Sequence, residues 1–520
     1  MFHDENFEQN NKKRLKVQNT ISKRCYFVPF KTRKLKTLKP IKLHLAKLYL
    51  FKIQCYSVLI RKFINCAQEK NASMRCVRFY TLFFSILMGF NNIYAQAIQV
   101  KLQKTNAGYT LLRNGEPYTV RGGGGQVNLD KLEQIGGNSI RTWSTDNARE
   151  YLDNAQKHGL TVMMGLWLGH ERHGFDYNDT VAVRKQFDYF KKQVLELRNH
   201  PALLFWGIGN EVDLFYTNTR VWNAVQDIAK MIHELDPNHP TSTVTAGLDS
   251  NEVKLIKSNC PDIDIYCVNT YGDLNFALNH IKGYGWSGPY MITEWGPNGH
   301  WEVAKTPWGA PLEQTGTEKA LTYHQRYLSI SSDSNFCLGS YLFLWGQKQE
   351  TTPTWYGLFD EKGNATEALD FMHAHWKKSA PANKTPELQQ LGFKVQDSVL
   401  RYASFKNAEK IKVIVKVRDA ENDRLVHRYK VIPESQYTKA GGDAEISPEP
   451  IGIVFNKNSE GAIFKAPSTA GTYRLFYSCY DGNGHVAYGN LPFQIQASKA
   501  VRSISFKTRH LKHEFGGKDE

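Results

Sequence analysis

The chain has 520 residues, of which 41% are hydrophobic and 12% aromatic, and its formal net charge at pH 7 is +16. That charge is concentrated at the start, because residues 1–73 hold 17 Lys and Arg against 4 Asp and Glu, whereas residues 98–497 come to about −2. A basic chain ordinarily indicates nucleic acid as a partner, and this uneven distribution excludes that interpretation for the main body.

Residues 74–97 have the order of a secretory signal peptide. A short basic start is followed by an apolar run at 79–90 and by the small residues Ala95 and Ala97. The run is shorter than the roughly 20 residues that a membrane-spanning helix needs. We therefore expect a secreted, periplasmic or cell-surface protein with no integral membrane segment in the mature chain.

The basic segment 1–73 has two interpretations. The simpler one is that translation starts at Met74 and that this segment is not part of the mature protein. The alternative is a basic cytoplasmic extension that retains the apolar run as a membrane anchor. A mature N-terminus near Gln96 or Ile98 would support cleavage, and an intact Met1 would exclude it.

From residue 98 to about residue 376, apolar runs typical of strands alternate with amphipathic helical patterns. A short hairpin comes first, with Asn114-Gly115 as its turn. Eight strands are then predicted, at Thr119–Gly122, Ser139–Trp143, Thr161–Trp167, Leu203–Gly209, Ser242–Ala246, Ile263–Val268, Tyr290–Thr293 and Gly339–Leu344. Eight strands with intervening helices over about 260 residues predict an α/β fold of the (β/α)8 TIM barrel type. An open doubly wound sheet is the alternative.

Two of these strands are followed by a glutamate. Glu211 comes after the fourth strand and Glu294 after the seventh. A lone Glu at such a place is more often the cap of the next helix. The two residues are 83 positions apart, nearly three of the ~31-residue units of a TIM barrel. They are therefore expected to face each other across the end of the barrel where active sites of this fold lie.

Two facing carboxylates suit either acid–base chemistry on a glycosidic bond or metal binding. The densest set of further metal ligands is His170-Glu171-Arg172-His173, whose histidines are three apart and so do not form HExxH. We expect no metal and no other cofactor. His170 is interpreted either as a polar rim residue or as a substrate contact.

Two other features of the sequence do not indicate a cofactor site. The glycines of Gly122–Gly125 lack the GxGxxG spacing, so no nucleotide site is expected, and they are interpreted as a sharp turn at the barrel rim. The cysteines of the main body have no zinc-site spacing. A disulfide between Cys260 and Cys337 is conceivable, and free buried thiols are preferred.

The chain resembles the retaining glycoside hydrolases of the large (β/α)8 clan, most closely the barrel domain of family 2, the β-galactosidase, β-glucuronidase and β-mannosidase group. The resemblance covers roughly residues 110–376. Its five motifs fall in the family's order and are Asn138-Ser-Ile-Arg141-Thr-Trp143, Gly209-Asn210-Glu211, Val268-Asn-Thr-Tyr271-Gly, Thr293-Glu294-Trp295-Gly296 and Tyr341-Leu-Phe-Leu-Trp345-Gly. It implies an enzyme that cleaves β-glycosidic bonds by double displacement, with Glu211 as acid/base and Glu294 as nucleophile. The aromatic-rich stretches 296–308 and 347–356 are expected near the mouth of the barrel and favour a β-linked oligo- or polysaccharide as substrate. With the signal peptide, the enzyme is expected to be secreted.

The resemblance also implies roles for the residues around the pair. Arg141 and Tyr271 would hold the nucleophile ionised, Asn210 would bond the sugar hydroxyl next to the anomeric carbon, and Trp345 would offer a flat face to the sugar. His170 and Trp295 complete the predicted substrate contacts.

The chain departs from family 2 because only a short lead-in precedes the barrel, where that family usually carries a jelly-roll and an immunoglobulin-like domain. Gly-Asn210-Glu211-Val also resembles the β-1,3-glucanosyltransferases. A β-glucan transglycosylase of the same clan and a non-catalytic carbohydrate-binding barrel are therefore the alternatives.

The C-terminal part is predicted to be all-β. Residues 377–390 have the composition of a linker, and residues 391–497 alternate apolar and polar residues between turns, as in a small immunoglobulin-like sandwich. We expect this domain to pack against the barrel rather than to bind sugar. The basic tail 498–520 is expected to be disordered.

Overall fold

The computed structural model describes residues 97–436, 438–439 and 441–497. The predictions for the upstream segment 1–73, for all but the last residue of the signal peptide 74–97 and for the tail 498–520 lie outside the described residues. Within the described part of the chain, every helix is too short or too polar to cross a bilayer.

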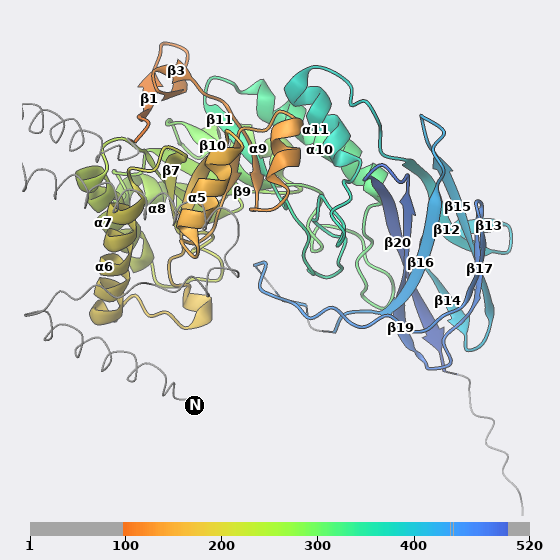
Figure 1. The fold of residues 1–520 in the computed structure, drawn as a ribbon. Coiled ribbons are helices and arrows are strands. Elements are labelled where there is room, and N and C mark those ends of the chain that lie inside the picture. Colours follow the sequence, from red (N-terminus) through yellow and green to blue (C-terminus); the bar gives the residue numbers. More distant parts are fainter. Residues whose placement is uncertain (1–96, 437, 440, 498–520) are drawn as a thin grey trace, which may run out of the picture. The chain divides into compact units, whose positions relative to one another are not determined.

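Eight parallel strands close into a barrel (Figure 1), in the ring order β10-β11-β4-β5-β6-β7-β8-β9. These strands are β4 (Val120–Gly124), β5 (Ser139–Arg141), β6 (Thr161–Leu166), β7 (Leu203–Ile208), β8 (Thr241–Ala246), β9 (Ile265–Asn269), β10 (Tyr290–Trp295) and β11 (Cys337–Leu342). All eight predicted strands are found, so the TIM barrel is confirmed and the open sheet is wrong. Residues of β7 and β10 are buried along the whole strand, because helices cover one side and the barrel interior fills the other.

Helices follow the strands around the ring. They are α4 (Leu129–Gln134), α5 (Ala148–Lys157), α6 (Thr180–Leu197), α7 (Arg220–Leu235), α8 (Ser250–Asn259), α9 (Leu274–Gly283), α10 (Gly316–Ser332) and α11 (Ala368–Lys377), with the short 3-10 helix η1 (Glu171–His173) after β6. Sequence signals set several starts. The Asp179 side chain accepts from two backbone N–H groups at the start of α6, and Thr315 and Glu318 form a capping box at the start of α10.

The lead-in forms a small sheet of β1 (Val100–Lys104), β2 (Tyr109–Arg113) and β3 (Glu116–Pro117). Asn114 and Gly115 both have positive φ, as the predicted hairpin turn requires. Val100 and Leu111 of this sheet belong to one apolar cluster with the first residues of several barrel strands, including Val120 and Leu204. The sheet thus covers the N-terminal end of the barrel and leaves the C-terminal end for the site.

The glycines predicted to form a rim turn lie instead mostly inside strand β4. A Cβ on Gly122 would come within 2.2 Å of the Tyr341 ring, and one on Gly123 within 2.7 Å of the Trp345 ring. The glycine run therefore makes room for large aromatic side chains of the neighbouring strand β11 and the loop after it. This correction has a steric cause that sequence spacing does not encode.

The C-terminal domain is a sandwich of two sheets, with orders β13-β12-β15-β18-β17 and β14-β20-β19-β16. Its strands are β12 (Glu387–Val395), β13 (Ser398–Leu400), β14 (Ala403–Lys406), β15 (Lys410–Arg418), β16 (Val426–Pro433), β17 (Phe455–Asn458), β18 (Gly461–Lys465), β19 (Gly471–Tyr480) and β20 (Val486–Gln496) (Figure 1). All pairings are antiparallel except β14 with β20. The first strand starts inside the predicted linker 377–390, because Glu387 and Leu388 already pair with β15.

The cysteines of the described residues are free thiols. Cys260, Cys267, Cys337 and Cys479 are all buried and unpaired. The conceivable disulfide between Cys260 and Cys337 is therefore absent, as the preference for free thiols anticipated.

Candidate active site

The two glutamates lie at the C-terminal ends of their strands. Glu294 is part of β10, and Glu211 follows β7 by three residues. Helix α7 begins only at Arg220, so Glu211 does not cap it. Gly209 and Glu211 both have positive φ, 75° and 51°. For a glutamate this left-handed conformation is strained, and such strain is concentrated at functional sites.

Three donors converge on the carboxylate of Glu294, which is only 5% exposed. Arg141 Nη1 lies 2.9 Å and Trp143 Nε1 lies 2.8 Å from Oε1, and the Tyr271 hydroxyl donates to Oε2 at 3.1 Å. Burial, followed by the charge of Glu294, raises the pKa of Tyr271 well above its ordinary value, so its hydroxyl remains a donor. This arrangement stabilises negative charge on Glu294.

A network of amides links this carboxylate to Glu211. The Asn269 side chain accepts from Arg141 at 3.2 Å and donates to Glu211 Oε1 at 2.8 Å. Asn269 Nδ2 also donates to Asn210 Oδ1 at 3.1 Å, and Arg141 Nη2 donates to the same oxygen at 2.5 Å. Strands β5, β7, β9 and β10 therefore each contribute to one polar constellation, which fixes the two carboxyls relative to each other.

The surroundings of Glu211 disfavour a negative charge on its carboxyl, whereas the donors around Glu294 stabilise one. Desolvation in the cavity and the negative charge of Glu294 raise the pKa of Glu211 well above its ordinary value, and the hydrogen bond from Asn269 partly opposes them. Its carboxyl therefore keeps a proton near neutral pH, as a general acid must.

Both glutamates line one cavity of about 290 Å³, near the lower end of the range for small-molecule sites. Its walls are mostly aromatic and polar, and they are made by Trp143, Trp167, Asn210, Glu211, Tyr271, Glu294, Trp301, Phe343, Leu344, Lys348, Glu350, Gly441 and Gly442. Aromatic faces beside paired carboxyls are suited to the apolar C–H faces and hydroxyl edges of sugars.

Two of the predicted substrate contacts, both tryptophans, lie behind the cavity wall. Trp345 is fully buried, donates to the Val127 carbonyl at 2.8 Å and packs edge-on against Phe359. Trp295 is fully buried against Tyr323. Both rings belong to the packed layer that supports the site, and neither lines the cavity.

His170 also lies outside the cavity lining. Its ring stacks on Trp167 at 4.6 Å between centroids, and its Nδ1 faces Arg172 Nε at 3.2 Å. Burial, followed by the positive charges of Arg172 and His173, lowers the pKa of His170 to about 4, so the ring is neutral at pH 7. His170 supports the cavity wall through Trp167.

The structure brings in residues that sequence reasoning left without a role. Trp143 and Asn269 contact the glutamates directly. Both stand in the motifs on which the resemblance rests, at strand ends close to Arg141 and Tyr271, so their position in the sequence was a usable signal. Trp167, at the end of the third predicted strand, and Trp301, in the aromatic stretch expected near the mouth, also line the cavity.

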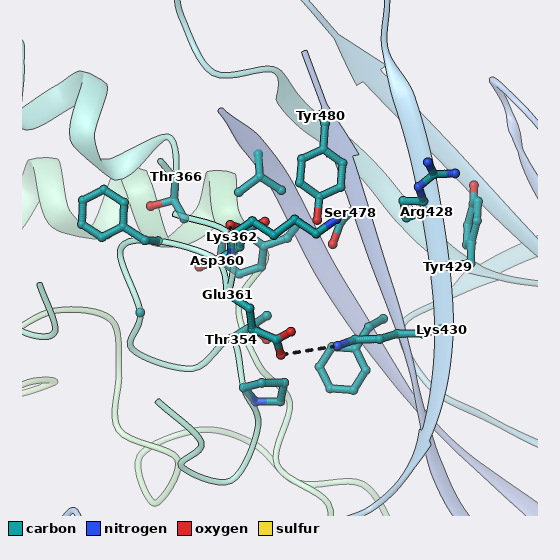
Figure 2. Close-up of a pocket in the computed structure, with 16 residues that line it drawn as sticks. Thr354, Asp360, Glu361, Lys362, Thr366, Arg428, Tyr429, Lys430, Ser478 and Tyr480 are labelled. Carbon is teal, nitrogen blue, oxygen red and sulfur yellow. Dashed lines mark hydrogen bonds and ion pairs between the residues drawn. The ribbon is translucent and has the colours of Figure 1, made fainter. Parts of the chain in front are cut away.

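A second hollow of about 250 Å³ lies among residues of the sandwich and of the chain after β11 (Figure 2). Lys430 Nζ lies 4.0 Å from Glu361 Oε1 and 5.6 Å above the Phe476 ring. Lys362 Nζ lies 5.6 Å above the Tyr480 ring. A lysine of the chain therefore lies over each of these two aromatic rings.

Metal ligands do not gather in the described residues. No three side chains of His, Cys, Asp or Glu come together there as a possible metal site.

Comparison with known proteins shows which proteins the barrel is similar to. Residues 126–298 match the model of the TIM barrel domain of glycosyl hydrolases family 2. The beta-glucuronidase of Pongo abelii is 23% identical over 156 residues, which are 29% of this chain and 22% of the relative. The beta-glucuronidase of Sus scrofa is 22% identical over 242 residues, 39% of this chain and 35% of the relative. The chain thus spans about a third or less of the length of these relatives.

Solved structures of similar proteins include a beta-glucuronidase of an uncultured Clostridium, with 19% identity, a TM-score of 0.43 and coverage of 54% of each chain. A Bacteroides uniformis beta-glucuronidase has 15% identity and a TM-score of 0.42, over 76% of this chain and 48% of the other. The closed ring of strands is a (β/α)8 barrel, and residues 126–298 within it are similar to the TIM barrel domain of glycosyl hydrolases family 2.

Proposed function

We propose that this protein is a β-glycosidase that acts with retention of configuration. The observation that carries the proposal is the contrast between two carboxyls in one cavity. Glu294 accepts three hydrogen bonds, one of them from Arg141, whereas burial and the charge of Glu294 keep a proton on Glu211. A non-catalytic sugar-binding barrel has no use for such a pair.

In the first step Glu211 donates its proton to the glycosidic oxygen while Glu294 attacks the anomeric carbon. The bond to the leaving group breaks, and a glycosyl ester forms on Glu294. In the second step Glu211, now a carboxylate, takes a proton from water. The water oxygen attacks the anomeric carbon and releases Glu294, and a second inversion restores the configuration.

Asn210 and Tyr271 support this chemistry. Because Asn210 Oδ1 accepts from Arg141 and Asn269, its Nδ2 group is the one that meets the hydroxyl next to the anomeric carbon. That contact strengthens in the transition state. Tyr271 and Arg141 serve as positioning residues for the nucleophile.

The charge of the cavity favours an uncharged terminal sugar. The relatives are named beta-glucuronidases, and a glucuronide carries a carboxylate. Among the described residues that line the cavity, Lys348 is the only cation, and its ammonium already lies 2.7 Å from Glu350 Oε2. The carboxylate of a glucuronide would therefore have to share Lys348 with Glu350, in a cavity that already holds the carboxylate of Glu294.

A panel of aryl β-glycosides tests the proposal. Matched β-glucoside, β-galactoside, β-mannoside and β-glucuronide substrates are compared at pH 6 to 7, and the configuration of the first product is read by proton NMR. We expect turnover of a neutral glycoside with β product formed first. Turnover of the glucuronide alone would overturn the neutral-sugar assignment, and α product would overturn retention.

Transglycosylation is read from the same reaction. Added oligosaccharide acceptors compete with water for the glycosyl ester, so longer products would indicate a transferase. Export is the remaining proposal, and N-terminal sequencing of protein recovered outside the cytoplasm tests whether residues 74–97 are removed.

A further inference from the structure

A segment of the sandwich takes part in the wall of the catalytic cavity. Residues 441–445 belong to the connection between β16 and β17. Gly441 and Gly442 nevertheless line the same cavity as Glu211 and Glu294. A domain expected only to pack against the barrel therefore reaches the reacting groups.

One anchor of this segment lies after strand β6. Asp443 Oδ2 accepts from Arg172 Nη1 at 2.9 Å and from His173 Nε2 at 3.1 Å. The side chain of Arg172 is only 9% exposed. Burial tends to raise the pKa of Asp443, but the hydrogen bonds from His173 and Arg172 outweigh it and lower that pKa, so the carboxylate stays charged.

The other anchor lies after strand β11. Lys348 Nζ donates to the Gly442 carbonyl at 3.0 Å, and the Thr351 N–H donates to Glu445 Oε2 at 2.7 Å. Lys348 therefore binds both this segment and the carboxylate of Glu350. This use of the ammonium agrees with the neutral terminal sugar proposed above.

The two glycines suit close contact with the cavity. Their φ values are +65° and +70°, in the left-handed region that favours glycine. A Cβ on Gly441 would lie 2.6 Å from Leu214 Cδ2, and one on Gly442 would lie 3.2 Å from Lys348 Nζ. A larger residue at either position would be strained by this φ and would press on the end of the Leu214 or Lys348 side chain.

The positions of the anchors show which side of the barrel mouth is covered. In the ring, β4 and β5 lie between β11 and β6, so the segment bridges the loops after the two strands that flank this pair. Trp143, which follows β5, lines the cavity beside it. The glutamates come from β7 and β10, which bound the other half of the ring.

We propose that residues 441–445 close one end of the cleft between Glu211 and Glu294, so that the enzyme removes single sugars from chain ends. This inference rests on the proposed glycosidase function. It makes Asp443 a specificity-determining residue contributed by the sandwich, acting through the position of Gly441 and Gly442.

The test uses the full chain and the aryl β-glycoside turned over in the panel. Beside it stands an aryl oligosaccharide of the same sugar whose non-reducing end is blocked by a benzylidene group. The wild type is expected to release single sugars and to leave the blocked substrate intact. Asp443→Ala should lower kcat/KM for the aryl monosaccharide about tenfold, the scale of one charged hydrogen bond, and should allow cleavage of the blocked chain.

Gly442→Ala provides a second route to the same displacement with a single added methyl group. Asp397→Ala, at an exposed turn of the same sandwich, is the matched control and should behave as the wild type. Cleavage of the blocked chain by the wild type, or an unchanged profile in both Asp443→Ala and Gly442→Ala, would overturn the inference while the glycosidase function stood. Absence of turnover on every glycoside would instead overturn the proposed function and the inference with it.

Discussion

Two buried ion pairs in this molecule have similar chemistry and different surroundings. At the cavity, Arg141 lies 2.9 Å from Glu294. Near the sandwich, Lys319 Nζ lies 2.6 Å from Glu313 Oε1. The Glu313 carboxylate also accepts from Thr354, Thr352 and Asn490, so both oxygens are enclosed by protein donors.

The difference shows what separates the proposed catalytic carboxylate of Glu294 from a structural one. Desolvation tends to raise the pKa of Glu313, but the charge and hydrogen bond of Lys319 prevail and the pKa is lowered. Glu313 is outside the linings of both cavities described above. Because Asn490 belongs to strand β20, this pair joins the sandwich to the barrel. Burial and a cation are thus shared by both sites, and only the open face opposite Glu211 distinguishes Glu294.

The variant expected to have the largest effect is Glu294→Ala, which removes the proposed nucleophile. We expect kcat to fall on the order of 10⁴-fold or more, because covalent catalysis is lost. Added azide should then yield a glycosyl azide of inverted configuration, detected by NMR. Activity unchanged from the wild type would refute the assignment of the nucleophile.

Glu211→Gln removes the proton donor and leaves the nucleophile in place. We expect a fall of about 10²–10⁴-fold in kcat/KM for alkyl glycosides, the usual range for general acid–base catalysis. Aryl glycosides with very acidic leaving groups need less protonation, so their first step should be much less affected. An equal loss for both substrate types would argue against the acid role.

The pH dependence of kcat/KM in the wild type also tests the role of Glu211 as the proton donor. Because the pKa of Glu211 is raised, the protonated acid persists to neutral pH and is lost as pH rises through that pKa. The alkaline limb of kcat/KM should therefore disappear in Glu211→Gln. Persistence of that limb would assign it to another group.

Glu313→Gln tests whether the Glu313–Lys319 ion pair contributes to stability and not to catalysis. It leaves Lys319 buried without its counter-charge, which typically costs about 3–5 kcal/mol of unfolding free energy. At a temperature where the variant is folded, kcat should match the wild type. Urea unfolding measures the loss, and Glu196→Gln on the exposed face of α6 is the matched control. A lower kcat in the folded variant would show that the Glu313–Lys319 pair also affects catalysis.

Trp143→Phe should have the smallest effect. It keeps an aromatic wall and removes the hydrogen bond of 2.8 Å to Glu294. Hydrogen bonds to charged groups contribute about 1.5–3 kcal/mol, so kcat should fall roughly tenfold or more. Trp308→Phe, outside the cavity lining, serves as the control. If Trp143→Phe leaves kcat intact, Arg141 and Tyr271 suffice to hold the carboxylate.

The sequence by itself determined the barrel and the two glutamates. Strand and helix periods are local properties, and a glutamate after a buried strand is visible without a structure. Even the spacing of Glu211 and Glu294 follows from the regular repeat of the fold.

Only the tertiary structure decided which side chains reach the cavity. Trp345 was expected to face the sugar, yet the space over Gly123 accommodates its ring inside the barrel wall, and Trp143 lines the cavity instead. Asp443 meets Arg172 across 271 positions of sequence. Such contacts depend on how separate elements dock, and neither periodicity nor local spacing encodes that.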